Sequence, residues 1–221
     1  MIITIDGPAG AGKSSAAKGL AQRLGFEFLD TGAMYRAVAL IALRTGINLR
    51  DESALAALVA SLRLAMPPGG RVLLDGEDVT DAIRTSEVTA ATGPVADSPS
   101  VRRCLVQMQR AIAEGRNMVC EGRDQGTIVF PDAVCKFFLF ADPVERAHRR
   151  QRQMEARGEK VELEQLLREQ EIRDQRDAAR DLAPMKPADD AICLDSTGKT
   201  PEQVVETMAA EVHRRIKKDE G

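Results

Sequence analysis

The chain has 221 residues, of which 43% are hydrophobic and 29% charged, and its formal net charge is −3. This composition predicts a globular protein with a substantial core, and the charge disfavours a nucleic-acid surface built on bulk positive charge. No apolar run is long enough to span a bilayer and no signal peptide is visible, so we expect a cytoplasmic protein. We expect free thiols at the scattered cysteines, which are Cys104, Cys120, Cys135 and Cys193.

The first predicted element is a short apolar strand over residues 1–5, which leads into a Gly-rich loop. Residues 7–14 of this loop read Gly-Pro-Ala-Gly-Ala-Gly-Lys-Ser, the G-x-x-x-x-G-K-[ST] phosphate-loop pattern between a strand and a helix. Backbone N–H groups and the positive end of the helix would bind phosphate there. Lys13 would reach the β- and γ-phosphates, and Ser14 would ligate Mg²⁺. The predicted nucleoside triphosphate site comprises Gly7, Pro8, Ala9, Gly10, Ala11, Gly12, Lys13, Ser14 and Ser15.

Helices and strands alternate along the rest of the chain. We expect helices over residues 15–24, 33–44, 51–64 and 101–113, from 143 towards 158, and from 201 onward. We expect strands over residues 26–29, 118–120, 134–140 and 191–194, with the second strand beside the first. Asp75-Gly76 predicts a β-hairpin, and Gly93-Pro94 and Ser98-Pro99 are expected to interrupt the chain. This alternation predicts a three-layer α/β fold with ligands at the carboxyl ends of parallel strands.

Two polar clusters follow predicted strands of this sheet. Thr31 and Arg36 follow strand 26–29 and offer a hydroxyl and a bidentate phosphate ligand, although a helix start with a solvated arginine is an equally good interpretation. Glu121, Arg123 and Asp124 follow strand 118–120. An acidic residue in this position holds Mg²⁺ through water in related folds, and charges buried there without a ligand would be costly.

A third cluster reads Arg-Asp-x-x-Asp-x-x-Arg over residues 173–180. On a helix, Arg173, Asp177 and Arg180 would share one face. Taken alone, this pattern favours a salt-bridged face in solvent. A second Gly-Lys-Thr at residues 198–200 lacks the first glycine of a phosphate loop, and we interpret it as a turn and a helix cap.

Together with the phosphate loop, the segments at residues 30–36, 121–133, 147–150, 173–180 and 188–197 resemble bacterial cytidylate kinase, a P-loop nucleoside monophosphate kinase family. The resemblance covers nearly the whole chain. It implies phosphoryl transfer from ATP to CMP or dCMP with Mg²⁺, on a five-stranded parallel core. The core would comprise residues 1–30, 94–148 and 181–221. The monophosphate-binding insertion, which includes the hairpin, would comprise residues 31–93. The lid and its flanking helix would comprise residues 149–180.

The resemblance also implies a role for individual residues of this chain. The acceptor phosphate would be bound by Thr31, Arg36, Arg123 and Arg180. The ribose would contact Arg173 and Asp177. The cytosine edge would be recognised by Arg102 and Asp124. The groups expected to act in catalysis are Lys13, Arg123 and Arg180. The lid arginines expected near the transferring phosphoryl group are Arg149, Arg150 and Arg157. Other members offer a serine to the base where this chain has Gly93, and whether Thr92 replaces it stays open.

Three other classes of protein share part of this pattern. Another small-acceptor P-loop kinase, acting on UMP or AMP, is the alternative, but adenylate kinases lack the segments at residues 30–36 and 121–124. A GTP-binding switch would need an Asn-Lys-x-Asp tetrapeptide, which does not occur. A nucleic-acid-dependent ATPase is disfavoured because 3% aromatic residues offer no stacking platform. We therefore expect small-molecule substrates, no nucleic-acid or membrane partner, and a monomer.

Overall fold

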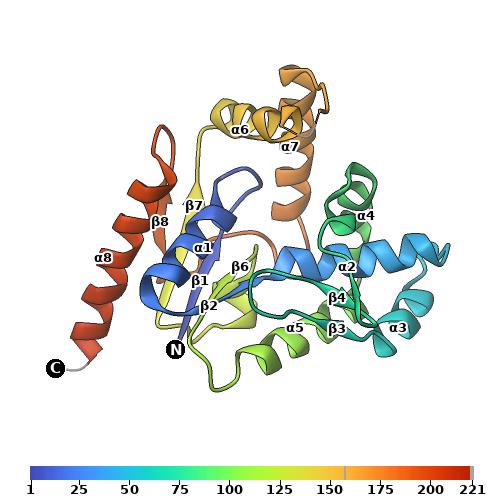
Figure 1. Cartoon of the computed structure of the whole chain (residues 1–221), viewed down its shortest axis with the longest axis horizontal. Helices are drawn as coiled ribbons and strands as arrows, with labels where there is room; N and C mark the ends of the chain where they lie inside the picture. The colour runs from blue at the N-terminus through green and yellow to red at the C-terminus, as the bar shows by residue number, and fades with distance from the viewer. Residues whose placement is uncertain (157, 220–221) are drawn as a thin grey trace. The chain divides into compact units, whose positions relative to one another are not determined.

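A five-stranded parallel sheet forms the framework of the fold (Figure 1). Its strands, in spatial order, are β2 (Glu27–Asp30), β6 (Met118–Glu121), β1 (Ile2–Asp6), β7 (Cys135–Phe140) and β8 (Ile192–Asp195). Ile5 of the central strand lies opposite Glu121 on one side and Phe137 on the other. Ile3 and Ile5 on one face of this strand and Thr4 on the other are fully buried, as expected for a parallel strand covered on both faces. The predicted α/β class and five-stranded parallel sheet are confirmed.

The order of the strands differs from the expectation in one respect. We expected the second strand beside the first, but β6 lies between β2 and β1. Hydrophobic pattern identifies a buried strand without specifying its neighbour, because the ladder hydrogen bonds come from backbone groups that every residue carries.

The computed structural model describes residues 1–156 and 158–219, and these form two compact units. The first unit comprises Met1–Glu27 and Asn117–Gly221, and the second comprises Phe28–Arg116. Residues 94–116, which the sequence analysis assigns to the core, therefore belong to the second unit. The functional division into core, insertion and lid stays a prediction. No helix of the described residues is long and apolar enough to cross a membrane.

The described part of the first unit also contains α-helices and a short π-helix. These are α1 (Lys13–Leu24), η2 (Gln125–Val129), α6 (Pro143–Glu155), α7 (Leu163–Ala178) and α8 (Pro201–Asp219). Of these, α1, η2 and α8 pack against strands of the sheet. Helices α1 and α8 lie side by side (Figure 1), so closely that a Cβ on Gly19 would meet Val205 at 2.7 Å. Helices α6 and α7 pair through buried Met154 and Leu166.

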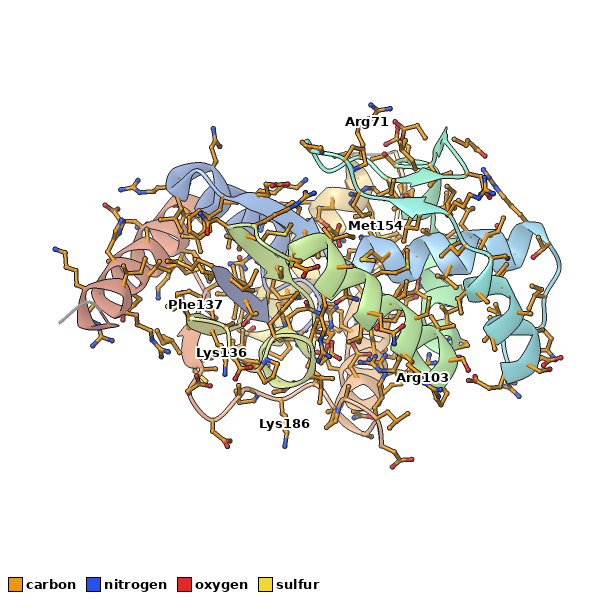
Figure 2. All side chains as sticks on the ribbon, turned by 90° about the horizontal axis from the view of Figure 1, so that it is seen from below. Arg71, Arg103, Lys136, Phe137, Met154 and Lys186 are labelled. Atoms are coloured by element: carbon orange, nitrogen blue, oxygen red, sulfur yellow. The ribbon has the colours of Figure 1, made fainter. Side chains whose placement is uncertain are left out.

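Neighbouring residues of β7 show how this unit separates its core from its polar contacts. Phe137 is buried in the core, whereas the ammonium of Lys136 lies 2.9 Å from the Asp190 carboxylate (both strand residues are labelled in Figure 2). Successive side chains of a strand point to opposite faces, which explains how adjacent residues reach such different surroundings.

The second unit is mainly helical. It contains α2 (Thr31–Arg44), α3 (Glu52–Ala60), η1 (Ala82–Arg84), α4 (Ser86–Asp97) and α5 (Pro99–Ala113), with α2 packed on α4 and α3 on α5. A small antiparallel sheet is built from β3 (Leu64–Ala65), β4 (Leu73–Leu74) and β5 (Glu77–Asp78). Asp75 and Gly76 join β4 to β5 with φ angles of 49° and 87°, which confirms the predicted hairpin. The helix expected over residues 51–64 ends at Ala60, and the last residue of that range, Leu64, instead begins β3.

Helix α4 contradicts the expected break at Gly93-Pro94, because Pro94 lies inside it. A proline inside a helix costs about 3 kcal/mol relative to alanine. Here Val88, Ala91 and Val95 are buried along one face, and this packing offsets that cost. Thr92 donates its hydroxyl to the Val88 carbonyl at 2.7 Å.

The break expected at Ser98-Pro99 is confirmed. Ser98 ends α4 and caps α5, its hydroxyl accepting from the Val101 N–H at 3.3 Å, and Pro99 is the first residue of α5. A proline in the first turn lacks an N–H that would have no helical partner there, so it starts a helix without loss.

Candidate active site

The phosphate loop joins β1 to α1 and depends on its glycines. Gly7, Gly10 and Gly12 have φ angles of 136°, 77° and 88°, which residues with a Cβ rarely adopt. Gly7 also approaches β7 so closely that a Cβ would lie 2.0 Å from the carbonyl oxygen of Leu139. The motif's glycines are therefore required by backbone conformation and, at Gly7, by contact with the neighbouring strand.

Side chains bind the loop's carbonyl oxygens from the protein side. Lys13 Nζ donates to the carbonyl of Pro8 at 2.7 Å, and Ser196 Oγ, just after β8, donates to that of Ala11 at 2.9 Å. Arg146 Nη1, on α6, donates to the carbonyl of Ala9 at 2.9 Å. In a trans peptide the C=O and the following N–H point in opposite directions. The N–H groups that follow these carbonyls are therefore directed away from the three side chains, as phosphate binding requires.

Lys13 is buried beside several charges. Burial, and then the nearby positive charge of Arg123, lower the pKa of the Lys13 ammonium to about 7. Both causes act against the charged form, whereas the negative charge of a bound triphosphate would favour it and raise this pKa. The protonation of this lysine should therefore change when nucleotide binds.

We expect ATP binding to take up about one proton at about pH 8, where Lys13 is mainly neutral in the free protein, and much less below its pKa. Calorimetric titration with a non-hydrolysable ATP analogue, in two buffers of different ionisation enthalpy, measures this uptake. The Lys13→Met variant is the control, and its ATP binding should not show this proton uptake. Equal uptake by both proteins would assign the proton to another group.

Ser14, in the first turn of α1, and Glu121, the last residue of β6, bring two oxygen ligands together. Ser14 Oγ donates to Glu121 Oε1 at 2.8 Å, and Glu121 is buried. Hydroxyl and carboxylate oxygens suit Mg²⁺, which retains several waters and needs few protein ligands beside substrate phosphates. These two residues therefore fit the predicted metal site, with Ser14 as a direct ligand and Glu121 acting through water.

Asp6, the last residue of β1, organises the segment after β6. Its two carboxylate oxygens accept from the N–H groups of Gln125 and Gly126 at 2.9 and 2.8 Å. Burial raises the pKa of Asp6 to about 7, although these hydrogen bonds act in the opposite direction. Asp6 thus fixes η2 directly after Arg123 and Asp124. Asp6 was not among the predicted site residues, although its place as an acidic residue ending an apolar strand was a usable signal.

Three of the predicted substrate residues meet in the first unit. Asp177, 4% exposed, lies between two guanidinium groups: its Oδ2 is 3.1 Å from Arg123 Nε and its Oδ1 is 2.6 Å from Arg180 Nη2. Arg173 lies one turn earlier on α7 and is near enough to lower the pKa of Lys13. Helix α7 ends at Ala178, so Arg180 is not on the helix as predicted, but it still reaches Asp177 from the following loop.

The other predicted phosphate ligands lie at the start of α2 in the second unit. Thr31 is buried at the first position, and Asp30 caps the helix by accepting from the Ala33 N–H at 2.8 Å. Asp30 also pairs with Arg36 at 3.1 Å, and Arg84 of η1 lies 3.8 Å from the same carboxylate. Two guanidinium groups beside one carboxylate leave a net positive charge. Arg84 was not predicted to belong to this cluster, because no recognisable motif in the sequence marks it.

The two residues expected to contact the base are both buried. Arg102, 7% exposed, donates to the Ala96 carbonyl at 3.3 Å and lies over the Tyr35 ring, 5.8 Å from its centroid. Asp124, 4% exposed, precedes η2, and its backbone carbonyl accepts from the Ile128 N–H at 2.9 Å. The Arg102 guanidinium is therefore held in a defined position within its unit, and the backbone of Asp124 is fixed at the start of η2.

Of the predicted lid arginines, Arg149 has the clearest contacts. It donates to Glu145 Oε1 at 2.9 Å, to Ser196 Oγ at 3.0 Å and to the Ser196 carbonyl at 2.7 Å. Because Ser196 in turn binds the phosphate loop, Arg149 lies close to that loop. Arg150 follows on α6, and Arg157 lies outside the described residues.

Three features lie together at the carboxyl ends of the parallel strands: a phosphate loop after the central strand, an oxygen pair suited to Mg²⁺, and a cluster of arginines. Together they define a P-loop kinase. A family model described as "Cytidylate kinase" matches residues 3–214 of the chain. The chain belongs to the cytidylate kinase family.

Curated relatives agree over nearly the full length. A cytidylate kinase of Pseudomonas aeruginosa (strain LESB58) is 48% identical over 219 residues, covering 97% of this chain and 96% of the relative. One from Citrifermentans bemidjiense is 47% identical and covers 98% and 94%. A solved structure of an uncharacterized protein from Eubacterium ventriosum has a TM-score of 0.54 at 13% identity, covering 96% of this chain and 98% of that one. It shows a likeness of fold alone.

Proposed function

We propose that this chain transfers the γ-phosphoryl group of ATP to CMP or dCMP, giving ADP and CDP or dCDP. The observation that carries the proposal is the Arg123–Asp177–Arg180 cluster, in the same unit as the phosphate loop. Transfer between two anionic nucleotides needs clustered positive charge and accurate positioning, with little covalent chemistry by the protein. The family and its curated relatives named cytidylate kinase support CMP as the acceptor.

Three cations have the central role in the proposed reaction. Lys13 would stabilise negative charge on the transferring phosphoryl group, while Arg123 and Arg180 would bind the acceptor phosphate. Asp177 holds both arginines in place before the substrate arrives. The phosphate of CMP would therefore bind both arginines in the positions that they already occupy. With CMP bound, we propose that Asp177 and Arg173 contact the ribose.

The second unit would contribute the remaining contacts to CMP. We propose that Thr31 and Arg36 bind its phosphate and that Arg102, with Asp124, recognises the cytosine edge. Asp30 restrains Arg36 in the same way as Asp177 restrains its arginines. A prepositioned arginine loses less side-chain freedom when the ligand binds.

Mg²⁺ and the lid complete the proposal. When bound, Mg²⁺ would neutralise phosphate charge, held by Ser14 directly and by Glu121 through water. Arg149 and Arg150 would contact the phosphates, and closure of the lid would exclude water, which otherwise competes as acceptor. We further propose that the protein is a cytoplasmic monomer. Size-exclusion chromatography would test its oligomeric state.

An ADP-release assay with CMP, dCMP, UMP and AMP in parallel tests the function. We expect the highest kcat/KM with CMP or dCMP, and little ADP release without an acceptor. A preference for UMP or AMP would assign the chain to a different acceptor. ADP release that is independent of acceptor would indicate a hydrolase.

A further inference from the structure

Arg146, near the start of α6, has three polar contacts although it is only 6% exposed. Its Nε donates to the Ala141 carbonyl at 3.2 Å, which anchors the guanidinium to the beginning of its own helix. Its Nη1 donates both to the Ala9 carbonyl in the phosphate loop at 2.9 Å and to Asp174 Oδ2 on α7 at 2.6 Å. One nitrogen therefore connects the phosphate loop to α7.

The packing around Gly10 makes this connection tight. A Cβ on Gly10 would lie 3.0 Å from Arg146 Cβ and 3.2 Å from Gln170 Oε1 of α7. The phosphate loop thus contacts both α6 and α7 next to the Arg146 guanidinium. Because close-packed interiors transmit displacement rather than absorb it, a shift of α7 would reach the loop at this point.

We infer that Arg146 is a positioning residue that couples the phosphate loop to α7, the helix that carries Arg173 and Asp177. Arg146 itself would contact neither ATP nor CMP. By holding the Ala9 carbonyl it directs the following N–H, that of Gly10, towards the triphosphate, since the two point in opposite directions in a trans peptide. Through Asp174 it ties that orientation to the helix that, on the proposed function, binds CMP.

Lysine cannot reproduce this contact. The rigid guanidinium fork places separate donors towards the Ala141 carbonyl and towards the Ala9–Asp174 pair, whereas an ammonium is a single point of charge on a flexible stem. Arg146→Lys therefore keeps the charge but loses the geometry. Asp174→Asn keeps the shape of the partner and removes its charge, so the two variants weaken the same link from either end.

The experiment measures binding of a non-hydrolysable ATP analogue by calorimetry, with and without saturating CMP. For Arg146→Lys we expect the affinity for the analogue to fall about 10-fold, the size of one lost charge-assisted hydrogen bond, with a parallel fall in kcat. Asp174→Asn should show a smaller effect in the same direction. The affinity for CMP alone should change less than about twofold, and any enhancement of analogue binding by CMP in the unmodified protein should diminish.

Arg152→Lys is the matched control, because Arg152 lies on the same helix with its side chain 68% exposed. It should bind the analogue and CMP as the unmodified protein does. Thermal melting of each variant shows whether it is folded. If Arg146→Lys is unfolded, Asp174→Asn provides the test.

Folded variants that bind the analogue normally would overturn the inference. So would an equal loss of analogue and CMP binding, since that pattern marks general support of the unit. If the unmodified protein binds the analogue but does not phosphorylate CMP, the proposed function fails, while the analogue titrations still decide the role of Arg146.

Discussion

Lys13→Ala is expected to lower kcat by about 10²-fold or more, the loss typical when one transition-state electrostatic contact is removed. Lys13 is buried in the phosphate loop, with its ammonium 2.7 Å from the Pro8 carbonyl. On the proposed function, this ammonium would stabilise the negative charge that accumulates on the transferring group. Steady-state kinetics with saturating ATP and CMP measure the effect, and calorimetry should show that CMP binding alone survives.

Lys18→Ala is the control, since Lys18 is an exposed lysine on the same helix. Its kcat should match that of the unmodified protein. Near-normal turnover by Lys13→Ala, with the variant folded, would contradict the assignment of residues 7–15 as the ATP-binding loop.

Arg102→Met and Asp124→Ala are expected to abolish the preference for CMP over UMP. Cytosine presents a donor at N4 and acceptors at N3 and O2, whereas uracil presents an acceptor at C4 and a donor at N3. A carboxylate accepts from the cytosine amino group and repels the uracil oxygen, while a guanidinium donates to cytosine and meets a donor on uracil. Buried polar sites of this kind discriminate by up to ~10⁴–10⁵, because the wrong base leaves their groups unpaired.

Both side chains are buried, which strengthens the expected effect. For each variant, kcat/KM with CMP should fall much further than kcat/KM with UMP, so that their ratio collapses. Arg103→Met, at the exposed neighbouring position of α5 (labelled in Figure 2), is the matched control and should leave the ratio unchanged. A parallel fall with both substrates would mean that these residues do not recognise the base, and that the pocket at Gly93 is built differently.

Local signals in the sequence were sufficient for several elements. Glycine is required at Gly7 and in the turn at Gly76 because the backbone there has φ angles of 136° and 87°. Ser98 and Pro99 start a helix through a hydroxyl cap and a fixed φ, and both effects operate within three residues. Such features are visible in sequence because their causes are local.

Other features depended on packing between distant segments. Pro94 is tolerated in α4 because buried neighbours offset its cost, and Arg180 reaches Asp177 from beyond the end of α7. The π-helix at residues 125–129 is held by the carboxylate of Asp6, 119 residues earlier in the chain. The sequence contains these residues but not their proximity.

The phosphate loop and the α/β fold could be predicted from the sequence, because Gly-rich loops, caps and apolar periodicity act over a few residues. The place of this chain among nucleotide kinases was predicted from its resemblance to a known family. Three features became known only from the folded chain: β6 separates β2 from β1, Asp177 lies between Arg123 and Arg180, and Arg146 links the loop to α7. Strand order and buried charge pairing arise from contacts between segments that are far apart in the chain. Such contacts form only when the whole core is packed.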